Sequence, residues 1–193
     1  MSTELSTYQT RYVAKKALFS FMGNTFRIFD TSGKLQFFIK QKAFKLKEEI
    51  NVFADEGQKE KRMTIAARSW GDFSGIYDIT DVATGEVVGA GKRHGLKSLF
   101  KDEWSILNAE GDEIGKVTEA TGCLFILSKF IKQIPTTYEL TIGDKQVGKF
   151  QQQFNPFTLA YDVEFTDADF DPRLGVGMCV LILAIEGAND ANK

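Results

Sequence analysis

The feature that most constrains this chain is an uninterrupted apolar run at residues 174–185, LGVGMCVLILAI. As a helix, this run presents no polar side chain at any angle, and the preceding Asp171 and Pro172 are typical of a helix start. A helix that is apolar on every side has to be buried on every side or to lie in lipid. Because a membrane span needs about 20 residues, the run predicts a buried helix over residues 172–186.

Short strands account for most of the chain before this helix. Residues 161–165 alternate strictly between apolar and acidic side chains, which is typical of a strand with one buried face. Turn sequences in which Asp or Asn precedes Gly, such as those at residues 30–33 and 108–111, separate the strand patterns. The patterns predict about 12 strands, near residues 10–19, 24–30, 34–41, 43–54, 60–68, 75–81, 85–92, 103–108, 112–120, 137–143, 146–152 and 157–166.

Strands and helix together predict a mainly β fold, a closed antiparallel barrel of about 12 strands around a central apolar C-terminal helix. A barrel of this size is too wide for its own side chains to fill, so the helix would occupy the interior. Gly175 and Gly177 would let strand side chains approach its first turns. The 193 residues fit a single domain, 1–193, with a flexible N-terminus at 1–9 and a flexible tail at 188–193.

Composition bears on the partner and on the compartment of the protein. A net charge of −2 and a pI near 5.6 argue against a nucleic-acid partner. Cys123 and Cys179 lie far apart in apolar runs, which indicates buried thiols in a reducing compartment. Residues 1–10 are polar and show no signal sequence. We therefore expect a cytoplasmic protein, with peripheral membrane association as an open alternative.

The sequence also resembles a known family. The stretches that carry the resemblance are residues 25–33, 42–50 and 95–107, and residues 153–157 followed by 171–174. In order and spacing they resemble the tubby C-terminal-like superfamily, and within it the LURP-one-related and phospholipid-scramblase-like branch, over about residues 10–187. The resemblance implies a 12-stranded barrel around a central C-terminal helix. It also implies lipid chemistry, because tubby domains bind phosphoinositide head groups and scramblase-like members are associated with lipid movement.

Basic residues crowd three places in the sequence, one of them the predicted strand with Lys61, Arg62 and Arg68, and the other two are the candidates for holding lipid phosphates. One cluster consists of Lys40, Lys42, Lys45 and Lys47, and the other of Lys92, Arg93, Lys97 and Lys101. The second surrounds Leu96, Leu99 and Phe100, which could touch acyl chains while the cations bind phosphates. The alternative is that these lysines and arginines are simply solvated. Charge is also uneven along the chain, with a net of +6 over residues 1–101 and −8 over residues 102–193.

Signatures of catalysis and metal binding are missing from the sequence. His94 is the only histidine and has no adjacent carboxylate for a nucleophilic triad. The acidic run at residues 167–171 fails as an EF-hand, because Pro172 and Met178 occupy the positions of the required Gly and Glu. Capping of the helix by Asp171 is the expected role. We therefore predict no catalytic residue, no metal and no cofactor.

The resulting prediction is a non-enzymatic binding module for anionic phospholipid or phosphoinositide head groups. Two alternatives stay open: scramblase-like lipid transfer, and a structural or protein-interaction domain with an unknown protein partner.

Overall fold

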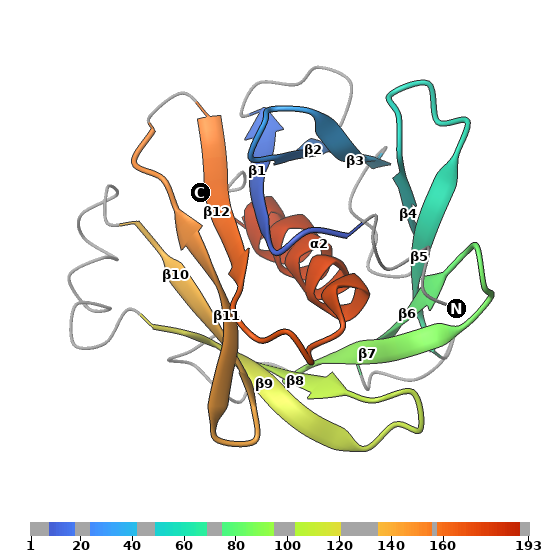
Figure 1. Ribbon diagram of the computed structural model, residues 1–193, viewed down its shortest axis with the longest axis vertical. Coiled ribbons are helices and arrows are strands. Elements are labelled where there is room, and N and C mark those ends of the chain that lie inside the picture. The colour runs from blue at the N-terminus through green and yellow to red at the C-terminus, as the bar shows by residue number, and fades with distance from the viewer. Residues whose placement is uncertain are drawn as a thin grey trace.

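The computed structural model describes residues 8–17, 24–41, 49–68, 75–94, 103–120, 135–155 and 158–189. Within these ranges the chain forms twelve strands and one helix (Figure 1). The strands are β1 (Arg11–Ala17), β2 (Asn24–Asp30), β3 (Leu35–Gln41), β4 (Ile50–Phe53), β5 (Lys61–Ala67), β6 (Ile76–Asp81), β7 (Val87–Arg93), β8 (Glu103–Leu107), β9 (Glu113–Glu119), β10 (Thr137–Ile142), β11 (Lys145–Gln152) and β12 (Thr158–Phe165), and the helix is α2 (Pro172–Asn189).

The strands form one closed antiparallel barrel in the order of the chain. Each strand pairs with its sequence neighbours, and β1 closes the barrel against β12, from Arg11 opposite Glu164 to Ala17 opposite Thr158. The predicted fold class is confirmed, and the strand positions agree closely. The predicted strand near residues 43–54 is described only from residue 49 onward, where it is the four-residue β4.

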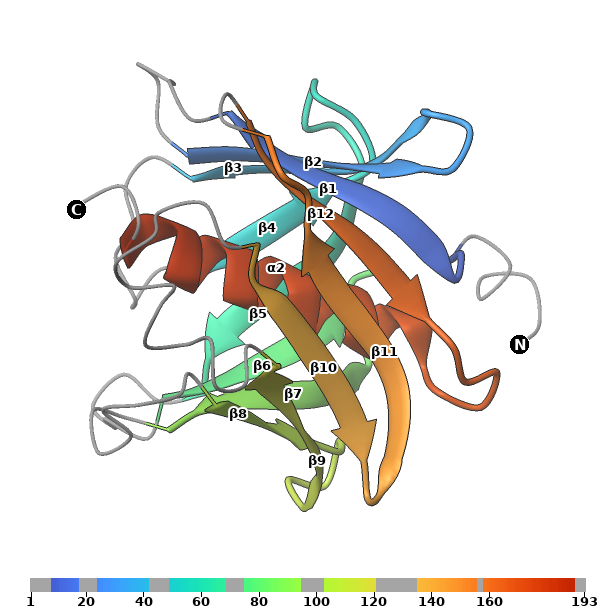
Figure 2. The ribbon, with the colours of Figure 1, turned by 90° about the vertical axis from the view of Figure 1, so that its left-hand side faces the viewer.

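Helix α2 runs through the middle of the barrel, as Figures 1 and 2 show. Every side chain from Leu174 to Ala184 that is not glycine is buried, including Met178 and Leu181, both fully enclosed. The predicted buried helix is thus confirmed, although it ends at Asn189 and not at residue 186. No helix among the described residues is long and apolar enough to cross a membrane. Cys179 is buried on this helix, which raises the pKa of its thiol.

Glycines allow the helix to pack tightly against the barrel wall. A Cβ on Gly177 would lie 2.7 Å from two side-chain carbons of Ile79, and one on Gly175 would overlap the ring of Phe165. The predicted role of these two helical glycines is confirmed. The wall contributes a glycine as well, because a Cβ on Gly91 of β7 would lie 2.8 Å from Cδ1 of Leu181.

Polar contacts hold the start of the helix in place. The Asp171 carboxylate accepts a hydrogen bond of 2.8 Å from the backbone N–H of Arg173, so the predicted cap is confirmed. The largely buried Arg173 guanidinium also contacts three carboxylates, those of Asp171 at 2.7 Å, Glu86 at 3.1 Å and Asp81 at 3.2 Å. Asp81 and Glu86 flank the turn between β6 and β7, so Arg173 joins the first turn of the helix to the wall.

We predict that Leu181→Ala lowers the free energy of unfolding by about 2–5 kcal/mol, because it leaves a cavity in an enclosed core. The leucine lies on α2, is fully buried and packs against Gly91 of β7. Urea denaturation measures the change. Val82→Ala, at a position that is 40% exposed, is the control and is expected to cost less than about 1 kcal/mol. An equally small loss at Leu181 would contradict the filled barrel.

Candidate functional site

The antiparallel order divides the connections between two ends of the barrel. The end at which α2 begins, here the helix-entry end, also holds the turns β2–β3, β4–β5, β6–β7, β8–β9 and β10–β11. The opposite end is called here the helix-exit end. The odd-numbered strands, among them β1, β3, β5 and β7, end there, and the even-numbered strands begin there. Figure 2 shows α2 running between the two ends. Alternate connections along the chain therefore meet at the same end.

The helix-entry end is strongly acidic. Its six connections span residues 31–34, 54–60, 82–86, 108–112, 143–144 and 166–171, all of them described. They carry ten acidic residues against two basic ones, Lys34 and Lys59. The acidic residues are Asp55, Glu56, Glu60, Glu86, Glu110, Asp112, Asp144, Asp167, Asp169 and Asp171.

Several carboxylates at this end have structural partners. Asp30 accepts bonds from the Ser32 hydroxyl at 2.6 Å and from the backbone N–H groups of Ser32 and Lys34 at 2.9 Å. These donors, led by the Ser32 hydroxyl and joined by the Gln36 amide, lower the pKa of Asp30 to about 2. Asp167 forms an ion pair of 2.8 Å with Lys145, which lowers the pKa of Asp167. Among the described residues, no group of three His, Cys, Asp or Glu side chains could hold a metal ion.

The helix-exit end brings together members of both predicted basic clusters. Lys40 lies near the end of β3, and Lys92 and Arg93 lie at the end of β7. The remaining predicted site residues, Lys42, Lys45, Lys47, Lys97 and Lys101, lie outside the described residues. They belong to segments that join β3 to β4 and β7 to β8, strands whose described ends meet here. Lys15 and Lys16, at the end of β1, also lie at this end, although no pattern in the sequence singled them out.

By sequence, the connections that start and finish at the helix-exit end are basic. Their ranges are 18–23, 42–49, 68–75, 94–102, 120–136 and 153–157, and much of this length lies outside the described residues. The basic residues are Lys42, Lys45, Lys47, Arg68, Lys97, Lys101, Lys129 and Lys132, against Glu48, Glu49, Asp72 and Asp102. By sequence, the connections of the helix-exit end therefore carry a net charge of +4, whereas those of the helix-entry end carry −8.

The basic residues at this end do not all face the same way. Because successive side chains of a strand point to opposite sides, Lys92 points outward next to Gly91, which packs on the helix. Arg93 points inward, where its charge opposes the rise in the pKa of Tyr77 that burial causes. Lys16 also points inward, with Nζ 5.3 Å from the ring centroid of Phe26. The predicted patch at residues 92–93 is thus divided by the barrel wall.

Three outward cations, Lys15, Lys40 and Lys92, have no carboxylate directly across on an adjoining strand. Lys40 faces Thr25, Lys92 faces Ile76 and Ser105, and Lys15 faces Arg27 and Ala160. Lys15 and Lys40 are exposed, and Lys92 is half-buried. These lysines are therefore available to an anionic partner.

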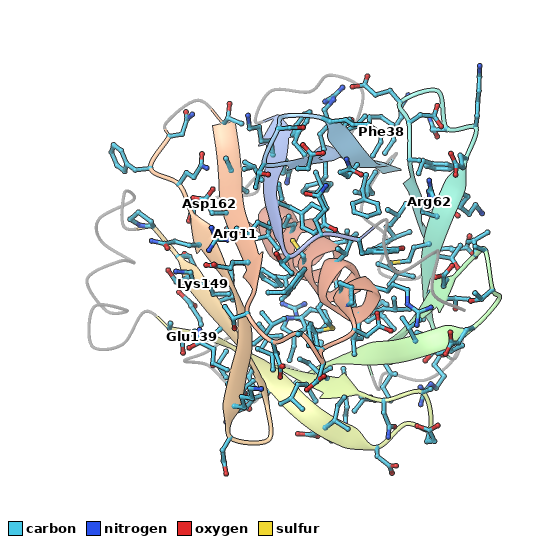
Figure 3. The ribbon with its side chains drawn as sticks, viewed as in Figure 1. Arg11, Phe38, Arg62, Glu139, Lys149 and Asp162 are labelled. Atoms are coloured by element: carbon cyan, nitrogen blue, oxygen red, sulfur yellow. The ribbon has the colours of Figure 1, made fainter. Side chains whose placement is uncertain are left out.

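The outer wall of β1, β12, β11 and β10 differs, because its charges alternate. Arg11 faces Glu164, Glu164 faces Lys149 and Lys149 faces Glu139 on successive strands. Figure 3 labels Arg11, Lys149 and Glu139 on this wall. The Nε atom of Arg11 donates to Glu164 at 3.0 Å. Cations that are compensated in this way are poor candidates for binding an external anion.

A serine and the single histidine also meet near this end. Nε2 of His94 lies 2.6 Å from the Ser105 hydroxyl across the β7–β8 pair, a contact that their spacing in sequence did not suggest. A catalytic serine has to reach its substrate, and its histidine is usually oriented by a third group. Ser105 is only 1% exposed, and no described carboxylate bonds to His94. The pair fits a structural hydrogen bond better than a nucleophile and its base.

Comparisons with known proteins give a family and a fold. A family model described as LURP-one-related matches residues 10–183. The structure is similar to the X-ray structure of a protein from Arabidopsis thaliana, with a TM-score of 0.52, 11% identity, and coverage of 100% of this chain and 99% of that chain. At this identity the likeness concerns the fold alone. A search of the curated proteins found no match.

The Asp30 network predicts a pH-dependent contribution to stability. Its pKa is about 2 in the folded protein and 3.8 as the ordinary value, so folding favours the ionised carboxylate. The contribution is complete above about pH 4 and is lost as the pH falls toward about 2. Asp30→Asn should therefore be less stable than the wild type at neutral pH, and the difference should narrow on acidification.

Urea denaturation at several pH values measures this difference. Asp144→Asn is the control, since Asp144 is exposed in the β10–β11 turn and its side chain makes no hydrogen bond with another described residue. If the difference in the free energy of unfolding between wild type and Asp30→Asn stays constant down to about pH 2, the network does not favour the ionised form of Asp30.

Proposed function

The chain belongs to the LURP-one-related family, and we propose that it is a non-enzymatic module that binds anionic phospholipid head groups with the helix-exit end of its barrel. The observation that carries this proposal is the separation of charge between the two ends. Lysines that face no carboxylate lie at the helix-exit end, whose connections are basic by sequence, whereas ten carboxylates lie in the connections of the helix-entry end. A negatively charged surface would attract the first end and repel the second.

The net charge of −2 does not oppose this orientation. The 18-residue helix that runs between the ends is about 27 Å long. Electrostatic interactions are screened within about 10 Å at moderate salt. A membrane at the helix-exit end would therefore sense the nearby lysines much more strongly than the distant carboxylates. Each cation close to an anionic surface contributes about 1 kcal/mol.

The same proposal assigns the protein to a membrane surface, on the cytoplasmic side. The apolar helix fills the barrel and is not exposed to lipid, so the contact would be peripheral. The buried Ser105 and the absence of a described carboxylate on His94 support a binding role over a catalytic one. Phosphoinositide head groups are the proposed ligands, because each carries several phosphates that can bind to several lysines.

Charge reversal tests the proposal. Lys40→Glu with Lys92→Glu removes two outward cations from the helix-exit end. Because each contributes about 1 kcal/mol, binding to vesicles that contain phosphoinositides should weaken at least about 30-fold. Flotation of vesicles with and without phosphoinositide, at low and high salt, measures this. Both positions are on the outside of the barrel wall, so folding should be preserved.

The chain provides a matched control. Lys34→Glu with Lys59→Glu makes the same change of charge in exposed turns at the helix-entry end, and binding should change less than about threefold. Equal weakening by the two double variants would mean that net charge alone matters. If the wild type fails to bind phosphoinositide vesicles at low salt, the lipid proposal is wrong, and a protein-interaction domain becomes the better description.

A further inference from the structure

Two large apolar side chains are conspicuously exposed among the described residues, one at each end of the barrel. Phe154 is 67% exposed in the β11–β12 connection, at the helix-exit end, and Val82 is 40% exposed in the β6–β7 turn, at the helix-entry end. Single exposed apolar residues are common on protein surfaces. Phe154 stands out because the exposed group is a whole aromatic ring at the basic end.

Hydrogen bonds fix the chain on both sides of Phe154. Before it, Gln152 exchanges two bonds with Thr136, its N–H donating at 2.8 Å and its side-chain oxygen accepting at 3.0 Å. The N–H of Gln153 donates to Ala160 at 2.8 Å, and its side-chain amide donates to Asp162 at 2.7 Å. The segment that carries the ring is thus attached to both neighbouring elements, although the ring itself is not packed.

After Phe154, the side chain of Asn155 also holds the loop, because it accepts a hydrogen bond of 3.2 Å from the backbone N–H of Thr158. A short loop that is pinned at both sides has little freedom to turn its side chain back onto the wall. The exposed ring is therefore part of the folded arrangement and is presented to whatever meets this end.

One exposed cation lies on the strand that adjoins this segment. Ala160, which accepts the bond from Gln153, is the cross-strand partner of Lys15 on β1. The next lysine, Lys16, points into the barrel and is buried. Lys15 is exposed, and its Nζ lies 5.3 Å from the ring centroid of Phe29. An exposed aromatic ring at the same end of a protein as exposed lysines is a combination that anchors proteins at the boundary between lipid head groups and acyl chains.

We propose that Phe154 is an interfacial anchor that inserts into an anionic bilayer when the helix-exit end docks on it. The inference rests on the proposed lipid binding and adds the orientation of the barrel and the residue that enters the membrane. Insertion of the ring adds an apolar contribution to the free energy of membrane binding, which salt does not screen. The lysines add an electrostatic contribution, which salt does screen. Stable peripheral attachment commonly needs two such contributions together.

Tryptophan substitution at the two exposed positions tests the orientation. The variants are Phe154→Trp and Val82→Trp, compared with the wild type because the chain already contains two tryptophans. On phosphoinositide vesicles with brominated acyl chains, the added fluorescence at position 154 should be quenched. The added fluorescence at position 82, next to the carboxylates of the helix-entry end, should not be quenched.

Removing the ring tests its contribution. Phe154→Ser should weaken vesicle binding about tenfold or more, and the ratio to the wild type should persist as salt is raised. Val82→Ser should leave binding unchanged. Vesicle binding without quenching at position 154, or unaffected by Phe154→Ser, would overturn the anchor, leave the proposed lipid binding intact and point to a protein as the partner of this ring. A wild type that binds no vesicles would overturn both.

Discussion

A closed barrel of twelve strands is wider than its own side chains can fill, and the rest of this structure depends on how that space is occupied. Helix α2 fills it with an apolar surface on every side. The fit requires small residues on both partners, because added Cβ atoms at Gly177 and Gly91 would collide with Ile79 and Leu181. Burial of large apolar side chains on both the helix and the wall then provides most of the stabilisation.

The filled interior also determines where function can reside. With the core occupied by the helix, a ligand is left with the outer wall and the two ends. Part of the wall pairs its charges across strands, as in the row from Arg11 to Glu139. The ends differ in sign, and the helix-entry end uses Arg173 and Asp171 to hold the helix in place. The helix-exit end keeps lysines that face no carboxylate directly across the strands, which makes it the candidate binding surface.

The sequence predicted those features that depend on local patterns. The all-apolar helix, the Asp171 cap and the role of Gly175 follow from composition and spacing alone, as do the strand positions. The sequence showed uneven charge along the chain but not its division between two ends, which follows from the antiparallel strand order: the ends of β3 and β7, with Lys40 and Lys92, lie at the same end of the barrel. Lys92 and Arg93 are adjacent in sequence but lie on opposite sides of the wall, because successive side chains of a strand alternate between its faces. The contact of His94 with Ser105 depends on the β7–β8 register, which no local pattern encodes.

The central claim is that the helix stays inside the barrel while the basic end meets the membrane. Hydrogen exchange of the backbone amides, with and without phosphoinositide vesicles, tests it most directly. Amides of residues 175–184 should exchange only on global unfolding in both conditions, while those near residues 91–94 and 152–155 should gain protection on the vesicles. Loss of protection along the helix when vesicles are added would show that it does not stay packed in the barrel, and would contradict the account.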